Sequence, residues 1–234
     1  MPNKITAIRV QEQRRDRASI YLDGEYAFGL QLVLAAGLHI GQELSADQIA
    51  MLKQRDEGER AYEATLHYLS YRPRSRREIE RYLAKRQVPE AQAAEVMARL
   101  ERARLVDDAA FARSFVESRA AMRPKSRWAL KQELRAKGVA EEDIEEAIEQ
   151  VDEQEGVRQV AQQYARRYAR LDEATFHRRM LGALQRRGYA YAMAAAVAAE
   201  TWQRLHPTQG DTVDEDSPGD EDVVARSYRC RKET

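Results

Sequence analysis

The segment Arg72-Pro73-Arg74-Ser75-Arg76 recurs 51 residues later as Arg123-Pro124-Lys125-Ser126-Arg127. Apolar and glycine positions keep the same register: Leu83 aligns with Leu134, Val88 with Val139, and, in a weaker third copy at an offset of 50, Gly138 with Gly188. Such periods are typical of stacked supersecondary units that bury their apolar faces against one another. The sequence therefore predicts tandem repeats.

Each repeat is predicted to contain three helices, at about residues 59–71, 75–87 and 90–104 in the first copy. Ser75 with Glu78 forms a capping-box pattern for the middle helix, and Asp107 or Asp108 is expected to cap the first helix of the second copy. The predicted fold class is mainly α, with the three-helix repeats in an elongated, curved array.

The N-terminal region has a different pattern. A β-prone run, Ile20–Phe28, is interrupted by Asp23-Gly24, which is a strong tight-turn signal. The run Ile5–Val10 can supply a third strand, so we expect a small antiparallel sheet. Ser45 and Gln48 fit the capping box of a following helix.

These patterns divide the chain into five parts. They are an N-terminal sheet with a linker helix at 1–58, repeats at 59–105, 106–153 and 154–206, and an acidic tail at 207–234. The tail has too few apolar residues to bury a core, so it is expected to be disordered.

Composition narrows the functional classes. The 234 residues include 33% charged and 7% aromatic residues, and the mean hydropathy is −0.73. No apolar run approaches the ~20 residues of a membrane-spanning helix, and the first residues lack a secretory signal. The single cysteine, Cys230, excludes a disulfide within the chain. We expect a cytoplasmic protein with no membrane contact, and a monomer.

Catalytic signatures are missing from the sequence. There is no phosphate-binding GK[ST] loop, and the four histidines lie far apart. An acidic run, Glu141–Glu146, leaves open a Mg²⁺-dependent nuclease involving Glu142, but acids also favour a helix N-terminus on electrostatic grounds. We expect a non-enzyme without a cofactor or metal.

The net charge of zero conceals a segregation of charge. Residues 60–138 carry a net charge of +9, residues 139–156 carry −9, residues 157–206 carry +6 and residues 207–234 carry −4. Such segregation is typical of a surface that binds a polyanion, although it also occurs where basic residues only solvate helices.

Helical spacing places the basic residues of the middle helices in stripes, opposite apolar residues such as Leu83 and Leu134. Like charges on one face repel, so a binding surface explains them better than folding does. The candidate contact residues are Arg72, Arg74, Arg76, Arg77, Arg81, Lys85, Arg123, Lys125, Arg127, Lys131, Arg135, Lys137, Arg178, Arg186 and Arg187.

Two stretches resemble a known family. Leu69–Leu83 is similar to the first repeat of RecX regulatory proteins, and Leu105–Val139 is similar to the second. The resemblance covers residues 59–204, and the predicted sheet resembles the extension of the longer family members.

The resemblance implies a non-enzymatic modulator of the RecA recombinase in DNA repair and the SOS response. Such proteins lie along the groove of the RecA–single-stranded DNA filament. They mainly inhibit filament growth, RecA ATPase, strand exchange and co-protease activity. The implied partners are the RecA filament and single- or double-stranded DNA. The alternative is a stand-alone nucleic-acid-binding protein that acts without RecA.

Overall fold

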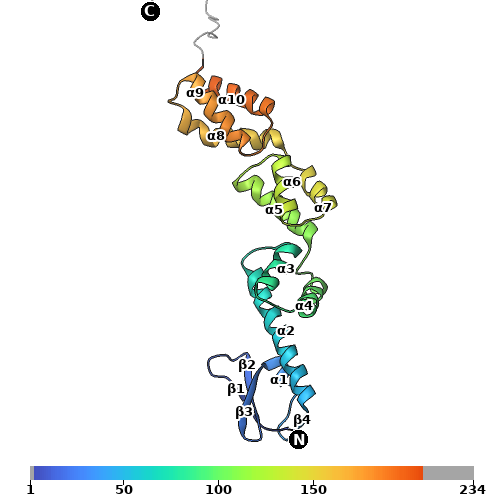
Figure 1. The fold of residues 1–234 in the computed structure, drawn as a ribbon. Coiled ribbons are helices and arrows are strands. Elements are labelled where there is room, and N and C mark those ends of the chain that lie inside the picture. The colour runs from blue at the N-terminus through green and yellow to red at the C-terminus, as the bar shows by residue number, and fades with distance from the viewer. Residues whose placement is uncertain (1–2, 208–234) are drawn as a thin grey trace, which may run out of the picture.

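The computed structural model describes residues 3–207 and shows an elongated chain of four successive units (Figure 1). The predicted tail at 207–234 lies outside the described residues except for Pro207. Among the described residues, no helix combines the length and the apolar character needed to cross a bilayer.

A four-stranded antiparallel sheet forms the N-terminal unit, in the order β3-β2-β1-β4. Its elements are β1 (Asn3–Val10), β2 (Arg17–Leu22), β3 (Glu25–Gln31), the short helix α1 (Leu32–Ala35) and β4 (Glu43–Leu44). Asp23 and Gly24 both have positive φ, +51° and +95°, which is the requirement of a type I′ hairpin turn. The predicted hairpin and third strand are confirmed, and the fourth strand, of two residues, is additional.

One long helix, α2 (Ala46–Ser70), joins the sheet to the first repeat. The predicted capping box of Ser45 and Gln48 starts it, so the helix expected from residue 59 begins 13 residues earlier, at Ala46. The division at residues 58 and 59 therefore falls inside a continuous helix. A buried ion pair, Arg17–Asp56 at 2.9 Å, attaches β2 to its side.

The remaining helices form three similar units. With the second half of α2, α3 (Arg76–Lys85) and α4 (Glu90–Arg102) form repeat 1. Repeat 2 contains α5 (Asp108–Met122), α6 (Arg127–Ala136) and α7 (Glu141–Glu149), and repeat 3 contains α8 (Glu153–Tyr168), α9 (Glu173–Gln185) and α10 (Tyr191–Leu205). Asp107 caps α5, as one of the two predicted candidates.

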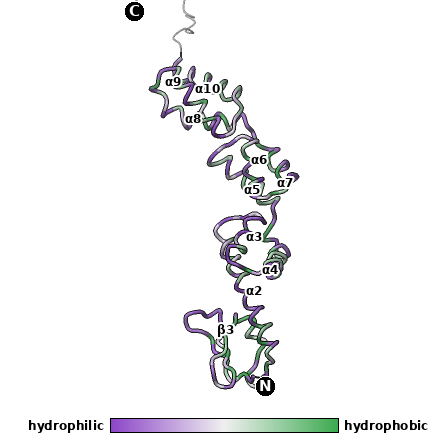
Figure 2. Tube along the Cα trace, viewed as in Figure 1, coloured by the Kyte–Doolittle hydropathy of each residue, from purple (hydrophilic) through white to green (hydrophobic). Residues whose placement is uncertain are grey.

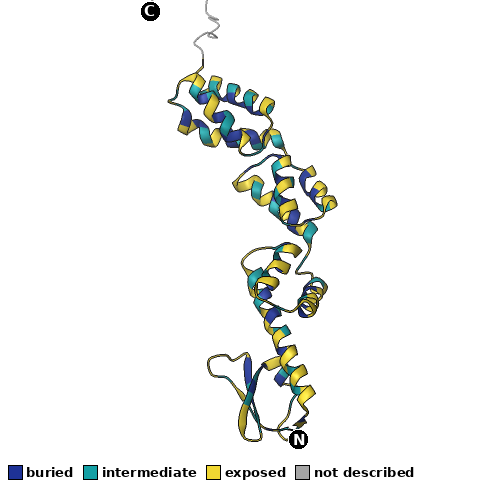
Figure 3. Ribbon diagram, in the orientation of Figure 1, coloured by how far each residue is buried: buried dark blue, intermediate teal, exposed yellow. Residues whose placement is uncertain are grey.

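Each repeat has its own hydrophobic core, contrary to the expectation that the units bury apolar faces against one another. Ile79, Leu83 and Leu100 are fully buried in repeat 1, and Phe176 and Met180 in repeat 3. No buried apolar cluster spans two repeats within the described chain. Figures 2 and 3 show apolar and buried positions inside each unit. Three helices therefore suffice for a core, and the joints depend on other contacts.

Candidate functional site

The middle helices α3, α6 and α9 carry the predicted contact residues, and their C-terminal ends fix how the repeats correspond. Residues Gln87, Gly138 and Gly188 follow these helices with φ of +58°, +80° and +89°. They occupy the left-handed position that commonly ends a helix. Residues that lie 51 or 50 positions apart in the sequence therefore occupy equivalent positions in successive repeats.

The joint between repeats 1 and 2 forms where α6 ends against the start of α3. The Ser75 hydroxyl donates to the Lys137 carbonyl at 2.7 Å, and a Cβ on Gly138 would lie 2.3 Å from the Cδ of Arg77. Gly138 is needed here for close approach as well as for its backbone angle. Gln87 keeps a similar φ without being glycine because no earlier repeat packs against it.

The joint between repeats 2 and 3 repeats this arrangement. The Ser126 amide donates to the Arg187 carbonyl at 3.1 Å, and the Arg187 guanidinium donates to the Pro124 carbonyl at 3.1 Å. A Cβ on Gly188 would lie 2.5 Å from the Ser126 hydroxyl. Because the two joints have similar contacts, each middle helix has a similar position relative to the next repeat.

On α3, three predicted contact residues project into solvent. Arg77, Arg81 and Lys85 are exposed and lie at i, i+4 and i+8, so they share one side of the helix. None of them forms an ion pair with another residue of the 3–207 region. This stripe keeps its full positive charge available.

On α6, the predicted stripe is neutralised by the next helix. Lys131 pairs with Glu141 at 2.6 Å and with Glu145, and Arg135 pairs with Glu141 at 2.7 Å. Hydrogen bonds from Arg135 and Lys131 lower the pKa of Glu141 to about 2. Arg127 donates to the Val151 carbonyl at 2.7 Å. These cations fasten α6 to α7 and to the start of α8.

The two stripes also occupy different positions in the repeat. Arg127, Lys131 and Arg135 correspond to Arg76, Glu80 and Ala84, whereas the α3 stripe corresponds to Trp128, Gln132 and Ala136. The α6 stripe is therefore displaced from the α3 stripe by one residue, and thus by about 100° around the helix.

On α9, the correspondence with α3 returns. Arg178 is equivalent to Arg77, and Arg186 is equivalent to Lys85. Both are exposed and neither has an ion-pair partner in the described part of the chain. In repeat 2, the position equivalent to Arg77 and Arg178 holds Trp128, which is 65% exposed. Trp128 was not identified as a candidate from the sequence. The repeat offset could have identified it, because it places this aromatic residue at the position of the candidate Arg77.

The other predicted residues have structural partners, with one exception. Glu78 binds Arg72 at 2.8 Å and Lys137 at 2.9 Å. Burial alone would raise the pKa of Glu78, but hydrogen bonds from Arg72 and Lys137 outweigh it and lower this pKa to about 2. The remaining contacts are Arg76 with Glu101, Lys125 with Glu133, and Arg74 stacked on the Tyr68 ring at 3.9 Å. Arg123 is exposed and forms no ion pair with a described residue.

Six predicted residues thus remain as free cations, a term we use for Arg77, Arg81, Lys85, Arg123, Arg178 and Arg186. The structure does not gather all fifteen candidates on one surface. It separates those that are bonded within a repeat or across a joint from those that are available to a partner.

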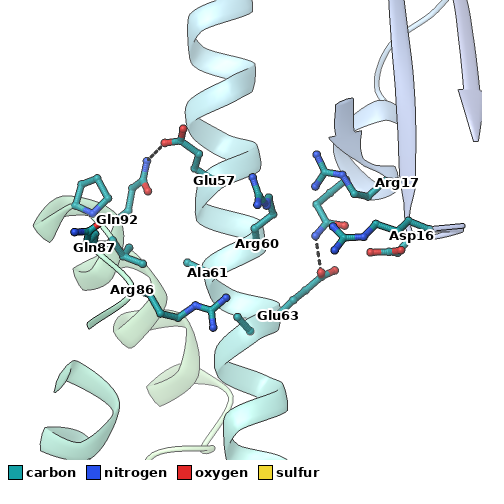
Figure 4. Close-up of a pocket in the computed structure, with 14 residues that line it drawn as sticks. Asp16, Arg17, Glu57, Arg60, Ala61, Glu63, Arg86, Gln87 and Gln92 are labelled. Atoms are coloured by element: carbon teal, nitrogen blue, oxygen red, sulfur yellow. Dashed lines mark hydrogen bonds between the residues drawn. The ribbon is translucent and has the colours of Figure 1, made fainter. Parts of the chain in front are cut away.

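A polar cleft of about 680 Å³ lies between the sheet and repeat 1 (Figure 4). Arg60 and Arg86 line it together with Glu57 and Glu63. Glu57 accepts a hydrogen bond from Gln92 (Figure 4), and Glu63 accepts one from Gln31. Acids and bases alternate in it, so it lacks the single sign of charge that would favour a polyanion. Within residues 3–207, no three His, Cys, Asp or Glu side chains are arranged to hold a metal ion.

Family models match the chain in four consecutive segments. They are the N-terminal domain of regulatory protein RecX at residues 3–45 and the first, second and third three-helix domains of RecX at 61–100, 107–148 and 152–209. Together they follow the sheet and the three repeats described above.

Curated proteins and solved structures give the same likeness. Regulatory protein RecX of Halalkalibacterium halodurans is 38% identical over 146 residues, which cover 60% of this chain and 55% of that protein. The counterpart from Oceanobacillus iheyensis is 38% identical over 143 residues, covering 58% and 53%. The chain therefore spans about half the length of these relatives.

Two crystal structures resemble the chain over longer stretches. One of a regulatory protein RecX aligns with a TM-score of 0.66 and 30% identity, covering 84% of this chain and 99% of that one. RecX from Lactobacillus salivarius aligns with a TM-score of 0.53 and 25% identity, covering 63% and 97%. The likeness extends over sheet and repeats, and not over a single repeat alone.

Proposed function

The chain belongs to the RecX family of regulatory proteins, and from this premise we propose that it binds the RecA–single-stranded DNA filament. Binding would restrain RecA ATPase, strand exchange and co-protease activity. The protein acts by occupying a surface and performs no chemistry of its own.

The observation that carries the proposal is the pattern of free cations on the middle helices. Positions that correspond to one another hold Arg77 and Lys85 in repeat 1 and Arg178 and Arg186 in repeat 3. Uncompensated like charges do not help folding. Their recurrence at equivalent positions supports selection for an anionic partner, such as phosphate groups or the acidic side chains of a protein groove.

The elongated shape supports a partner that is itself extended (Figure 1). Each free cation supplies a weak contact, but contacts held in series on one chain add up without a new loss of translational freedom at each repeat. A long filament offers such a series of sites. Trp128 lies at the equivalent position of repeat 2, and exposed aromatic residues surrounded by charges are common binding hot spots.

A stand-alone nucleic-acid-binding protein is the second candidate. The exposed Trp128 ring favours it, since nucleobases stack on aromatic side chains. If bare single-stranded DNA were the partner, six free cations would give a slope of at most about −4 for log affinity against log salt, at −0.7 for each neutralised phosphate.

Co-sedimentation distinguishes the candidates. The full chain is spun with RecA filaments assembled on single-stranded DNA with a non-hydrolysable ATP analogue, and separately with an equal amount of bare DNA. Tight binding that needs the assembled filament supports the regulator. Equal binding to bare DNA, with the slope given above, would contradict it and support the second candidate.

A further inference from the structure

An apolar groove of about 500 Å³ crosses the joint between repeats 2 and 3. Val116 and Ala120 of α5, Ala147 of α7 and Gly156 of α8 contribute to its floor. It is therefore lined from both repeats, and an occupant would contact both of them at once.

The rim of this groove is acidic. Five acids and two bases line it, and both bases are already used, because Arg113 pairs with Glu146 at 3.2 Å and Lys125 pairs with Glu133. Glu117, Glu149 and Glu155 are exposed and form no ion pair with a residue between 3 and 207. The groove thus suits a segment that is apolar and positively charged.

A second groove, between α2 and α4 in repeat 1, lacks this acidic excess. It is lined by Arg55, Arg99 and Arg102 as well as Glu59 and Glu95. A cationic segment is expected to avoid this site, so the acidic rim of repeats 2 and 3 provides selectivity.

The sequence contains one segment outside the described residues with the required chemistry. Residues 223–232, VVARSYRCRK, include four basic residues and no acid, together with Val223, Val224 and Tyr228. Residues 207–222 before them carry seven acids and no base. The acidic stretch is repelled by the rim, whereas the stretch that follows is attracted to it.

The length of the intervening chain fits the distance to be covered. Tyr189 stands two residues before α10, and a Cβ on Gly156 in the groove would lie 2.9 Å from its hydroxyl. From there α10 runs for 15 residues, about 22 Å at 1.5 Å per residue. Residues 207–222 number 16, and a flexible chain of that length has a root-mean-square span of about 22 Å. Effective concentration is greatest when the two lengths match.

We propose that residues 223–232 dock into the acidic groove between α5, α7 and α8 of the same chain. The basic side chains face Glu117, Glu149 and Glu155, and the apolar ones cover the floor. Because the groove belongs to two repeats, the docked segment braces the joint between repeats 2 and 3. This contact is independent of the proposed binding to RecA.

The single cysteine makes a direct test possible. A nitroxide spin label on Cys230 of the full chain broadens backbone amide resonances close to it in an NMR spectrum. We expect the amides of Ala120, Val151 and Gly156 to lose most of their intensity, while that of Ala84 on α3 keeps it. Loss of intensity elsewhere only, or nowhere, would overturn the proposal.

Charge variants and a mixed sample complete the test. The double variant Glu149→Lys with Glu155→Lys is expected to restore the groove signals, whereas the matched variant Glu90→Lys with Glu95→Lys on α4 leaves them broadened. The same spectra report whether each variant is folded. Broadening that survives the groove variant contradicts the proposal. So does broadening that appears equally when isotope-labelled chains without the spin label are mixed with spin-labelled chains, since that indicates a second copy as occupant.

Discussion

Helices α3 and α6 occupy the same place in successive repeats and carry similar numbers of basic residues, yet their charges serve different ends. On α3 the cations Arg77, Arg81 and Lys85 are free, whereas on α6 the cations Lys131 and Arg135 are held by Glu141 and Glu145. A shift of one residue around the helix decides the outcome. It turns the α6 cations toward α7 and the α3 cations toward solvent, so basic composition alone does not identify a binding surface.

The largest expected effect comes from removing matched pairs of charges. Arg81→Gln with Lys85→Gln should weaken binding to RecA filaments about 30-fold, because two exposed charge contacts are worth about 2 kcal/mol together. Lys131→Gln with Arg135→Gln should change binding less than about threefold. Fluorescence anisotropy of the labelled chain measures both, and equal losses would remove the distinction between the two helices.

The second prediction concerns the joint that presents α3. Gly138→Ala should destabilise the protein by about 1–3 kcal/mol, because alanine is strained in the left-handed region and its Cβ meets Arg77. Gln87→Ala is the matched control at a similar φ without a neighbouring repeat, and it should have little effect. Urea denaturation compares them; a similar small change in both would show that close approach at the joint is unimportant.

The third prediction concerns variants that free the cations of α6, so that they resemble the unpaired cations of α3. Glu141→Gln with Glu145→Gln releases Lys131 and Arg135, and it should strengthen binding to the filament about fivefold by adding available positive charge. The gain should disappear at high salt, where exposed charges are screened. A loss of affinity in these variants at low salt would mean that the acids themselves contact the partner.

The fourth prediction concerns how the stability of the joint depends on pH. Because the pKa of Glu78 is about 2 in the folded chain and ordinarily 4.5, its contribution to stability is present above about pH 4.5 and is lost as the pH falls toward 2. Glu78→Gln should therefore be less stable at pH 7 and show a shallower loss of stability over this range. Thermal unfolding between pH 2 and pH 7 measures this. If stability depends on pH equally in the wild type and the variant, Glu78 does not stabilise the joint.

Local signals made much of the fold predictable. The capping boxes of Ser45 and Ser75 and the Asp23-Gly24 turn depend on residues close in sequence, and each is found in the structure. The repeat offset was readable because equivalent joints need the same small residues, serine at one side and glycine at the other. The three-helix organisation follows from these signals.

The charges of the candidate site were not predictable in the same way. The ion pair that joins β2 to α2 is an example: Arg17 and Asp56 are 39 residues apart, and no local sequence pattern indicates that they meet. Lys131 is neutralised by Glu145 only because α7 crosses back beside α6. The acidic run from Glu141 favours a helix start, and its pairing with α6 depends on how two helices pack. Pairing across helices is a property of tertiary structure.

Site-specific cross-linking determines whether the exposed side of α6 contacts the filament. The photoreactive residue p-benzoylphenylalanine replaces Trp128 on the exposed side of α6 or, as a control, Glu142 on α7, and each variant is irradiated with RecA filaments. We expect cross-links to the filament from position 128 and none from position 142. Cross-links from position 142 with none from position 128 would contradict it.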